Sequence, residues 1–123
     1  METEFERAKA AIEAMRIGAA DTEEEIHMQA ARMFEKAGLA AEHEVRLAPR
    51  CRIDFMVGAI GVEIKKKRPQ KAALTAQLAR YAACPQVERL LVLAPRGVDL
   101  PNRIGEKPVT MMSLEKLWGI SLP

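Results

Sequence analysis

The chain of 123 residues is long enough for one domain with a single hydrophobic core and too short for two. Hydrophobic residues make up 49% and charged residues 29%, a composition that excludes an intrinsically disordered chain and is typical of globular proteins. The net charge of +2 is too small to indicate a partner, so the distribution of charge matters more.

Cysteine content and hydropathy exclude further classes of protein. Cys51 and Cys84 have neither the spacing of a metal site nor the density of a disulfide scaffold. No apolar run approaches the roughly 18 residues of a membrane span, and the N-terminal residues are acidic and helical rather than signal-like. We therefore expect a cytoplasmic protein that does not enter a membrane.

The chain begins with a predicted amphipathic helix over residues 2–17, which should end near Gly18. Its apolar residues recur at helical spacing: Phe5, Ala8, Ile12 and Met15. This face could cover the core or contact a second subunit.

A second helix should begin at Asp21 or Thr22, because Asp21 with Glu24, or Thr22 with Glu25, fits a capping box. It should end at residues 36–38. Its predicted apolar stripe consists of Ile26, Ala30, Met33 and Ala37.

Three consecutive glutamates open this helix. At about 100° per residue, Glu23 falls on the apolar stripe, Glu24 on the opposite side and Glu25 on a flank. Glu23 is therefore expected to point toward the sheet, although all three could instead act only as caps and helix-dipole partners. His27 lies one position from the stripe and His43 has no partner at metal-site spacing, so both are interpreted as structural residues.

A strand is predicted over residues 42–47, followed by a turn at residues 48–50 and a hairpin over residues 52–67. The Gly58-Ala59 pair suits a two-residue type II′ turn. With that turn, Asp54 lies opposite Glu63.

Alternation along the hairpin divides its residues between two faces. Ile53, Phe55, Val62 and Ile64 form the expected core face, and Asp54, Glu63 and Lys65 lie on the other face. Like charges directly opposite one another destabilise a sheet, so the carboxylates need a positive partner. A divalent cation and the Lys65 ammonium are the candidates, and oxygen ligands suit Mg²⁺.

The remaining elements follow in order. A helix is predicted over residues 70–83, with one stripe that contains Leu74, Gln77, Leu78 and Tyr81. The apolar run at residues 89–94 indicates a buried strand. A loop over residues 95–108, a short strand at residues 109–112 and a final helix capped by Ser113 complete the chain; that helix holds Leu114, Leu117 and Trp118.

Three motifs placed on these elements resemble the PD-(D/E)xK nuclease superfamily, in particular its branch of archaeal Holliday junction resolvases and RecB-like and VRR-NUC nucleases. The motifs are the Asp54 strand, Glu63-x-Lys65 and Gln77-x-x-x-Tyr81. The likeness covers roughly residues 21–95. Ile53 stands where the superfamily's name has Pro, and the first-helix acid is one of Glu23, Glu24 and Glu25, of which facing geometry favours Glu23.

The resemblance implies an α/β fold with a restriction-endonuclease-like core. In this core a mixed central sheet is flanked by helices, and the elements follow one another along the chain in the order αβββαβ. An extra helix precedes the core. A single domain over residues 1–123 would then contain the N-terminal helix (1–18), the core (21–95) and a C-terminal strand and helix (96–123).

The resemblance also implies a catalytic set, which consists of Asp54, Glu63, Lys65, Glu23, Gln77 and Tyr81. Asp54 and Glu63 would bind Mg²⁺ or Mn²⁺ with the carbonyl of Ile64 and with Glu23. Lys65 would orient or activate the attacking water, and Gln77 and Tyr81 would steady the site.

Basic residues near the hairpin are candidates for phosphate contacts. They are Lys66, Lys67, Arg68, Lys71, Arg52 and Arg80. The alternative for the lysine run is a solvated guard of an edge strand.

We therefore expect a metal-dependent deoxyribonuclease that recognises DNA structure or ends rather than sequence. Because cutting both strands takes two sites and the first helix offers an apolar face, a homodimer is expected. One alternative is a binding module on a nuclease-like fold, and another leaves Asp54 and Glu63 as surface charges without a role in nucleic-acid binding.

Overall fold

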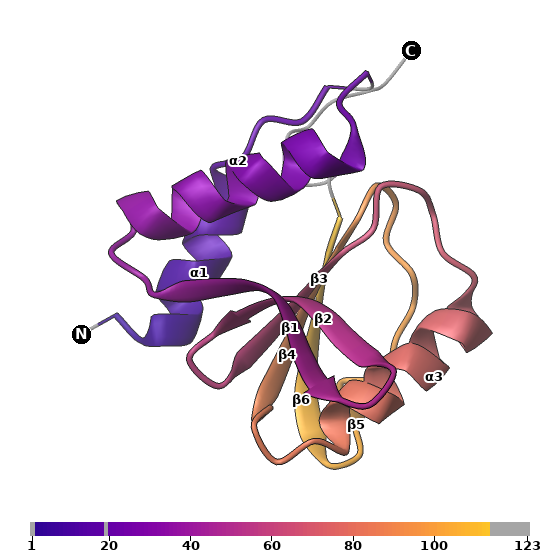
Figure 1. The fold of residues 1–123 in the computed structure, drawn as a ribbon. Helices are drawn as coiled ribbons and strands as arrows, with labels where there is room; N and C mark the ends of the chain where they lie inside the picture. Colours follow the sequence, from indigo (N-terminus) through magenta and orange to yellow (C-terminus); the bar gives the residue numbers. More distant parts are fainter. Residues whose placement is uncertain (1, 19, 114–123) are drawn as a thin grey trace.

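The computed structural model describes residues 2–18 and 20–113, which form three helices and one six-stranded mixed sheet (Figure 1). The helices are α1 (Glu4–Glu13), α2 (Glu23–Lys36) and α3 (Lys71–Ala82). The strands are β1 (Ala41–Ala48), β2 (Cys51–Val57), β3 (Ile60–Ile64), β4 (Arg89–Ala94), β5 (Arg103–Ile104) and β6 (Lys107–Ser113). The expected α/β class is confirmed.

The strands are arranged in the order β1-β2-β3-β4-β6-β5. Strands β1, β2 and β3 are antiparallel neighbours, whereas β4 runs parallel to both β3 and β6. A parallel neighbour needs a crossover connection, and α3 supplies it between β3 and β4. Leu90, Leu91, Val92 and Leu93 are all fully buried, so β4 is the central strand that its apolar run predicts.

Two hydrophobic clusters cover the two faces of the sheet. One cluster joins α1 and α2 to residues such as Phe55, Val62 and Leu91. The other joins α3 to Met56, Leu90 and Val92. Figure 1 shows α1 and α2 on one side of the sheet and α3 on the other. In the described part of the chain, no helix is both long and apolar enough to cross a membrane.

The apolar face of α1 packs within the chain. Ala8, Ile12 and Met15 are fully buried in the cluster that α1 shares with α2 and the sheet. The helix ends at Glu13, earlier than the predicted residue 17. The expectation that α1 leaves an apolar face for a second subunit is therefore wrong for these residues.

Helix α2 starts with the second of the two predicted capping boxes. The Thr22 side chain accepts a hydrogen bond from the Glu25 N–H, and the Glu25 side chain accepts one from the Thr22 N–H. The buried face, however, consists of Ile26, His27, Ala30 and Phe34. It is rotated toward His27 relative to the predicted stripe, and the Glu23 side chain is 69% exposed at the rim instead of pointing inward.

The hairpin register is confirmed at Val57–Ile60, Met56–Gly61 and Phe55–Val62. Gly58 has φ +60°, as the first central residue of a type II′ turn requires. A Cβ at this position would also collide with the Glu4 carboxylate of α1. The positive φ of the turn therefore favours glycine, whereas the flexible Glu4 side chain can move aside.

The hairpin departs from regular alternation before Phe55. Ile53 belongs to the cluster under α3, whereas Phe55 packs under α1 and α2, so the prediction that they share one face is wrong. The paired register of β2 and β3 ends at Phe55–Val62. Beyond that pair, the side chains of Asp54 and Glu63 form the hydrogen bonds between the two strands.

The C-terminal part contains one strand that the sequence did not indicate. β5 (Arg103–Ile104) lies within the predicted loop and pairs with the start of β6 across a turn at Gly105. The predicted strand at residues 109–112 is the middle of β6. The predicted helix with Leu114, Leu117 and Trp118 lies outside the described residues.

Candidate functional site

Asp54 and Glu63 come together where the pairing of β2 and β3 stops. The Ile64 N–H donates to Asp54 Oδ2 at 2.7 Å, and the Asp54 N–H lies 3.4 Å from Glu63 Oε1. Each carboxylate thus bonds to the backbone of the opposite strand and replaces the bonds that a regular ladder would form. The two acidic side chains are held together by backbone geometry.

Glu63 is only 4% exposed, and its partners come from two elements. Lys65 Nζ lies 3.0 Å from Oε2, and the Tyr81 hydroxyl of α3 lies 3.1 Å from Oε1. The Lys65 N–H donates to the Leu93 carbonyl, which fixes the chain just after β3. The interpretation of both acids as surface charges therefore does not fit Glu63.

Burial raises the pKa of both carboxyl groups. For Glu63, desolvation is the largest cause and the charge of Asp54 adds to it, while Lys65 and Tyr81 oppose the rise in pKa. For Asp54, desolvation again dominates and the Ile64 N–H opposes it. Without a further cation, each charge is held at a cost in folding free energy.

Tyr81 and Gln77 form one hydrogen-bonded unit beside Glu63. The Tyr81 hydroxyl donates to the Arg52 carbonyl at 2.8 Å, and Gln77 Nε2 donates to the Tyr81 oxygen at 3.0 Å. Burial and the neighbouring Glu63 raise the pKa of the Tyr81 phenol. The amide in the buried stripe of α3 therefore positions Tyr81, which in turn contacts Glu63.

His27 is the residue at this site that the sequence interpretation missed. Its side chain is 7% exposed, and its Nε2 lies 3.7 Å from Asp54 Oδ2 and 3.8 Å from Glu23 Oε1. This nitrogen is buried and has no hydrogen-bond partner. The available signal was Phe34, two helical turns after His27, because including it rotates the apolar face of α2 toward His27.

The basic candidates have different surroundings. Lys66, Lys67 and Arg68 are exposed just after β3, and Lys71 is exposed at the start of α3. Because β3 lies between β2 and β4, these residues do not guard a sheet edge. The other two are also exposed: Arg52 lies 3.8 Å from Glu44, and Arg80 is on α3.

The donor set at the hairpin fits a hard divalent cation. Asp54 and Glu63 offer carboxylate oxygens, Ile64 offers a backbone carbonyl, and such oxygen ligands suit Mg²⁺. A cation there would lower the pKa of Glu63, which desolvation and then the charge of Asp54 raise. Glu23 lies at the rim of this group, where its Oε1 is 3.8 Å from the His27 nitrogen that lies 3.7 Å from Asp54 Oδ2.

No protein-family model, curated protein or solved structure matches this chain. A function must therefore be inferred from the residues and their geometry.

Proposed function

We propose that the protein is a nuclease of the PD-(D/E)xK type, with a restriction-endonuclease-like core, that uses Mg²⁺ or Mn²⁺ to hydrolyse DNA phosphodiester bonds. The observation that carries this proposal is the cluster of Asp54, Glu63 and Lys65, in which the Lys65 ammonium lies 3.0 Å from a buried carboxylate. The three antiparallel strands, the α3 crossover and the parallel β4 give the element order expected for such a core.

Asp54 and Glu63, with the Ile64 carbonyl and Glu23, would hold the metal ion. When bound, such an ion would act as a Lewis acid on the phosphoryl group and on the attacking water. Lys65 orients the water and places a positive charge near the charge that develops on the phosphate. Tyr81 holds Glu63 in place, and the imidazole of His27 lies beside Asp54.

DNA is the proposed substrate, and Lys66, Lys67, Arg68 and Lys71 would contact its phosphates, with Arg52 and Arg80 at the margins. Such contacts give affinity and salt dependence without reading bases. The described residues form one sheet with its helices and include no separate DNA-reading domain. Recognition of DNA structure or ends therefore fits better than recognition of sequence.

The test is to incubate purified protein with branched, duplex and single-stranded DNA and with RNA, in Mg²⁺, in Mn²⁺ and in chelator. Metal-dependent cleavage of DNA that is lost in Asp54→Ala and Lys65→Ala is expected. Cleavage of no substrate, or cleavage that survives both changes, would refute the proposal. Metal-independent DNA binding without cleavage would favour the binding module.

The proposed homodimer rests on the need for two sites to cut both strands of a duplex. The buried face of α1 no longer supports it. Sedimentation of the protein with a branched DNA would show whether two chains bind one junction, and a single bound chain would contradict the homodimer.

A further inference from the structure

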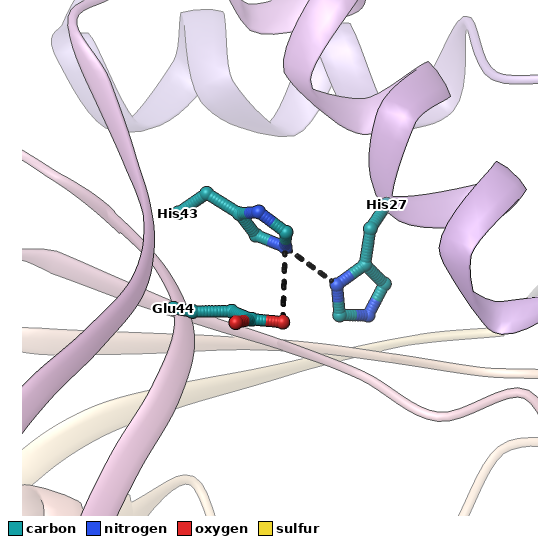
Figure 2. Close-up of side chains that lie close together, drawn as sticks. All are labelled: His27, His43 and Glu44. Carbon is teal, nitrogen blue, oxygen red and sulfur yellow. Dashed lines mark hydrogen bonds and ion pairs between the residues drawn. The ribbon is translucent and has the colours of Figure 1, made fainter.

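A second group of side chains that can ligate a metal consists of His27, His43 and Glu44 (Figure 2). It lies next to the carboxylate pair, because His27 Nε2 is 3.7 Å from Asp54 Oδ2. His27 Nδ1 from α2 lies 2.9 Å from His43 Nε2 of β1, and His43 Nε2 lies 3.9 Å from Glu44 Oε1. The ligand atoms of these three residues all lie within 4.8 Å of one another.

The backbone of Glu44 explains how two consecutive strand residues reach the same point. Successive side chains of a strand normally point to opposite faces. Glu44 has φ +52°, and the register pairs His43 with Phe55 and Val45 with Ile53 but omits Glu44. A left-handed conformation is uncommon for a residue other than glycine and costs on the order of 1 kcal/mol or more. This irregularity brings the Glu44 carboxylate close to the ring of His43.

The surroundings of the group are those of a cation site. An open cavity of about 460 Å³ is lined by Glu23, Glu24, His27, His43 and Glu44, and among residues 2–18 and 20–113 no lysine or arginine lines it. Beneath it, the Phe55 ring stacks on His43 at 4.7 Å and lies 5.7 Å from His27. Packing against Phe55 supports one face of each imidazole ring, as the shell around a metal site does.

We propose that His27 Nδ1, His43 Nε2 and the Glu44 carboxylate bind a transition-metal ion of the Zn²⁺ type, separately from the Asp54–Glu63 pair. Two imidazoles and one carboxylate suit zinc and leave a position for water, whereas Mg²⁺ is bound through oxygens. This site does not depend on the proposed nuclease activity.

The distances allow such an ion with small movements. Two nitrogens 2.9 Å apart can both lie about 2.0–2.1 Å from one zinc ion. The side chains of His43 and Glu44 are 45% and 54% exposed, so they can turn toward the ion without disturbing the core. Arg52, 3.8 Å from Glu44 Oε2, orients the carboxylate so that Oε1 faces His43.

His27 relates this site to the carboxylate pair. Its Nδ1 faces His43, whereas its Nε2 faces Asp54 and Glu23. A metal ion on Nδ1 leaves the proton of the neutral ring on Nε2, where it can be donated to a carboxylate. The buried Nε2, which has no hydrogen-bond partner in this structure, would then carry a proton and act as a hydrogen-bond donor.

The experiment is a calorimetric titration of the chelator-treated full chain with ZnCl₂. One ion per chain is expected. His43→Ala and Glu44→Gln should each weaken zinc binding at least about tenfold. Both residues are exposed, so neither change should prevent folding. Glu42→Gln, which removes an exposed carboxylate from the same strand, is the matched control and should bind zinc like the wild type.

Two further measurements locate the ion. In nitrogen NMR spectra of the imidazoles, zinc should shift His27 Nδ1 and His43 Nε2 and leave His27 Nε2 protonated. Asp54→Asn should retain zinc binding. Loss of zinc binding in Asp54→Asn would place the ion at the carboxylate pair and overturn the proposal.

Absence of zinc binding, or equal binding by His43→Ala, Glu44→Gln and Glu42→Gln, would also overturn it. The two proposals can fail separately: a protein that binds zinc at this site but cuts no DNA refutes only the nuclease, and the reverse result refutes only the zinc site.

Discussion

Asp54 shows how a single buried charge affects stability. Desolvation raises its pKa, and the charges of Glu23 and Glu44 raise it further. A carboxyl group with a raised folded-state pKa binds more protons when folded than when unfolded, so its contribution to stability falls as the pH rises from about 4 through that pKa. We predict that, in chelator at pH 7–8, Asp54→Asn stabilises the protein by on the order of 1 kcal/mol.

Chemical denaturation of both proteins across a pH series measures this effect. The difference in unfolding free energy between the two proteins should vanish at low pH, where Asp54 and Glu63 are both protonated in the wild type. Asp99→Asn makes the same change at an exposed position and should have little effect. A metal-free Asp54→Asn protein that is less stable than the wild type at pH 7–8 would contradict the prediction.

Tyr81 leads to a different prediction because its hydroxyl has several partners. Tyr81→Phe leaves the Gln77 amide and the Arg52 carbonyl without this hydroxyl and removes a donor from Glu63. Loss of such partly buried hydrogen bonds should destabilise the protein by about 1–3 kcal/mol. The pKa of Glu63 should rise, because the bond from Tyr81 lowers it.

Urea denaturation measures the stability of Tyr81→Phe, and the pH dependence of cleavage measures the second effect. The acidic limb of the profile should move to higher pH. Gln77→Ala removes one donor and keeps the hydroxyl, so it should cause a smaller loss. An unfolding curve of Tyr81→Phe that superimposes on the wild-type curve would rule out the positioning role.

At the level of single residues, the sequence predicts that Asp54, Glu63 and Lys65 meet, because a two-residue turn fixes the hairpin register. It does not predict the environment of His27. A helical stripe centred on Ile26 and Met33 differs by only one position from the stripe that the sheet selects, and only the packing of Phe34 against Phe55 decides between them. The nearness of His43 and Glu44 depends on a backbone irregularity that alternation cannot reveal.

Among the elements, the end of β3 determines where the lysines lie. The strand stops at Ile64, and the bond from the Lys65 N–H to Leu93 directs the Lys65 side chain toward Glu63. The next residue, Lys66, is exposed. We predict that Lys65→Ala lowers the rate of DNA cleavage about 10²–10³-fold, the usual loss when one group that stabilises transition-state charge is removed.

Lys66→Ala is the matched control, since it removes the same side chain from an exposed position. It should retain cleavage at saturating DNA and reduce the salt dependence of binding by about 0.9 in log–log slope for one lost phosphate contact. Single-turnover cleavage and binding titrations at several salt concentrations separate the two variants. Equal cleavage by both would show that Lys65 has no special role.

The secondary structure was predictable wherever a local signal was strong. The capping box at Thr22, the Gly58 turn and the apolar run of β4 each define an element through chemistry within a few residues. The side on which Ile53 packs could not be predicted, because it depends on where two strands stop pairing. β5 has only two residues and no periodicity that a sequence could reveal.

For the whole molecule, we predict that Mg²⁺ stabilises the metal-free protein. A ligand that binds only the folded state at 100 times its Kd adds about 2.7 kcal/mol to the unfolding free energy. Thermal unfolding in Mg²⁺ and in chelator should show this increase for the wild type and much less for Asp54→Asn. Sodium chloride at matched ionic strength should not reproduce it, and equal stabilisation of both proteins would contradict a site at Asp54.

The number of residues in the turn between β2 and β3 determines whether Asp54 and Glu63 come together. An added residue at Gly58 or Ala59 would shift the register and turn Glu63 to the opposite face of the sheet. The connection between β4 and β5, residues 95–102, lies outside the β2–β3 hairpin, so its length does not set this register. Insertions acquired during evolution would thus be tolerated in that connection and removed by selection at the turn.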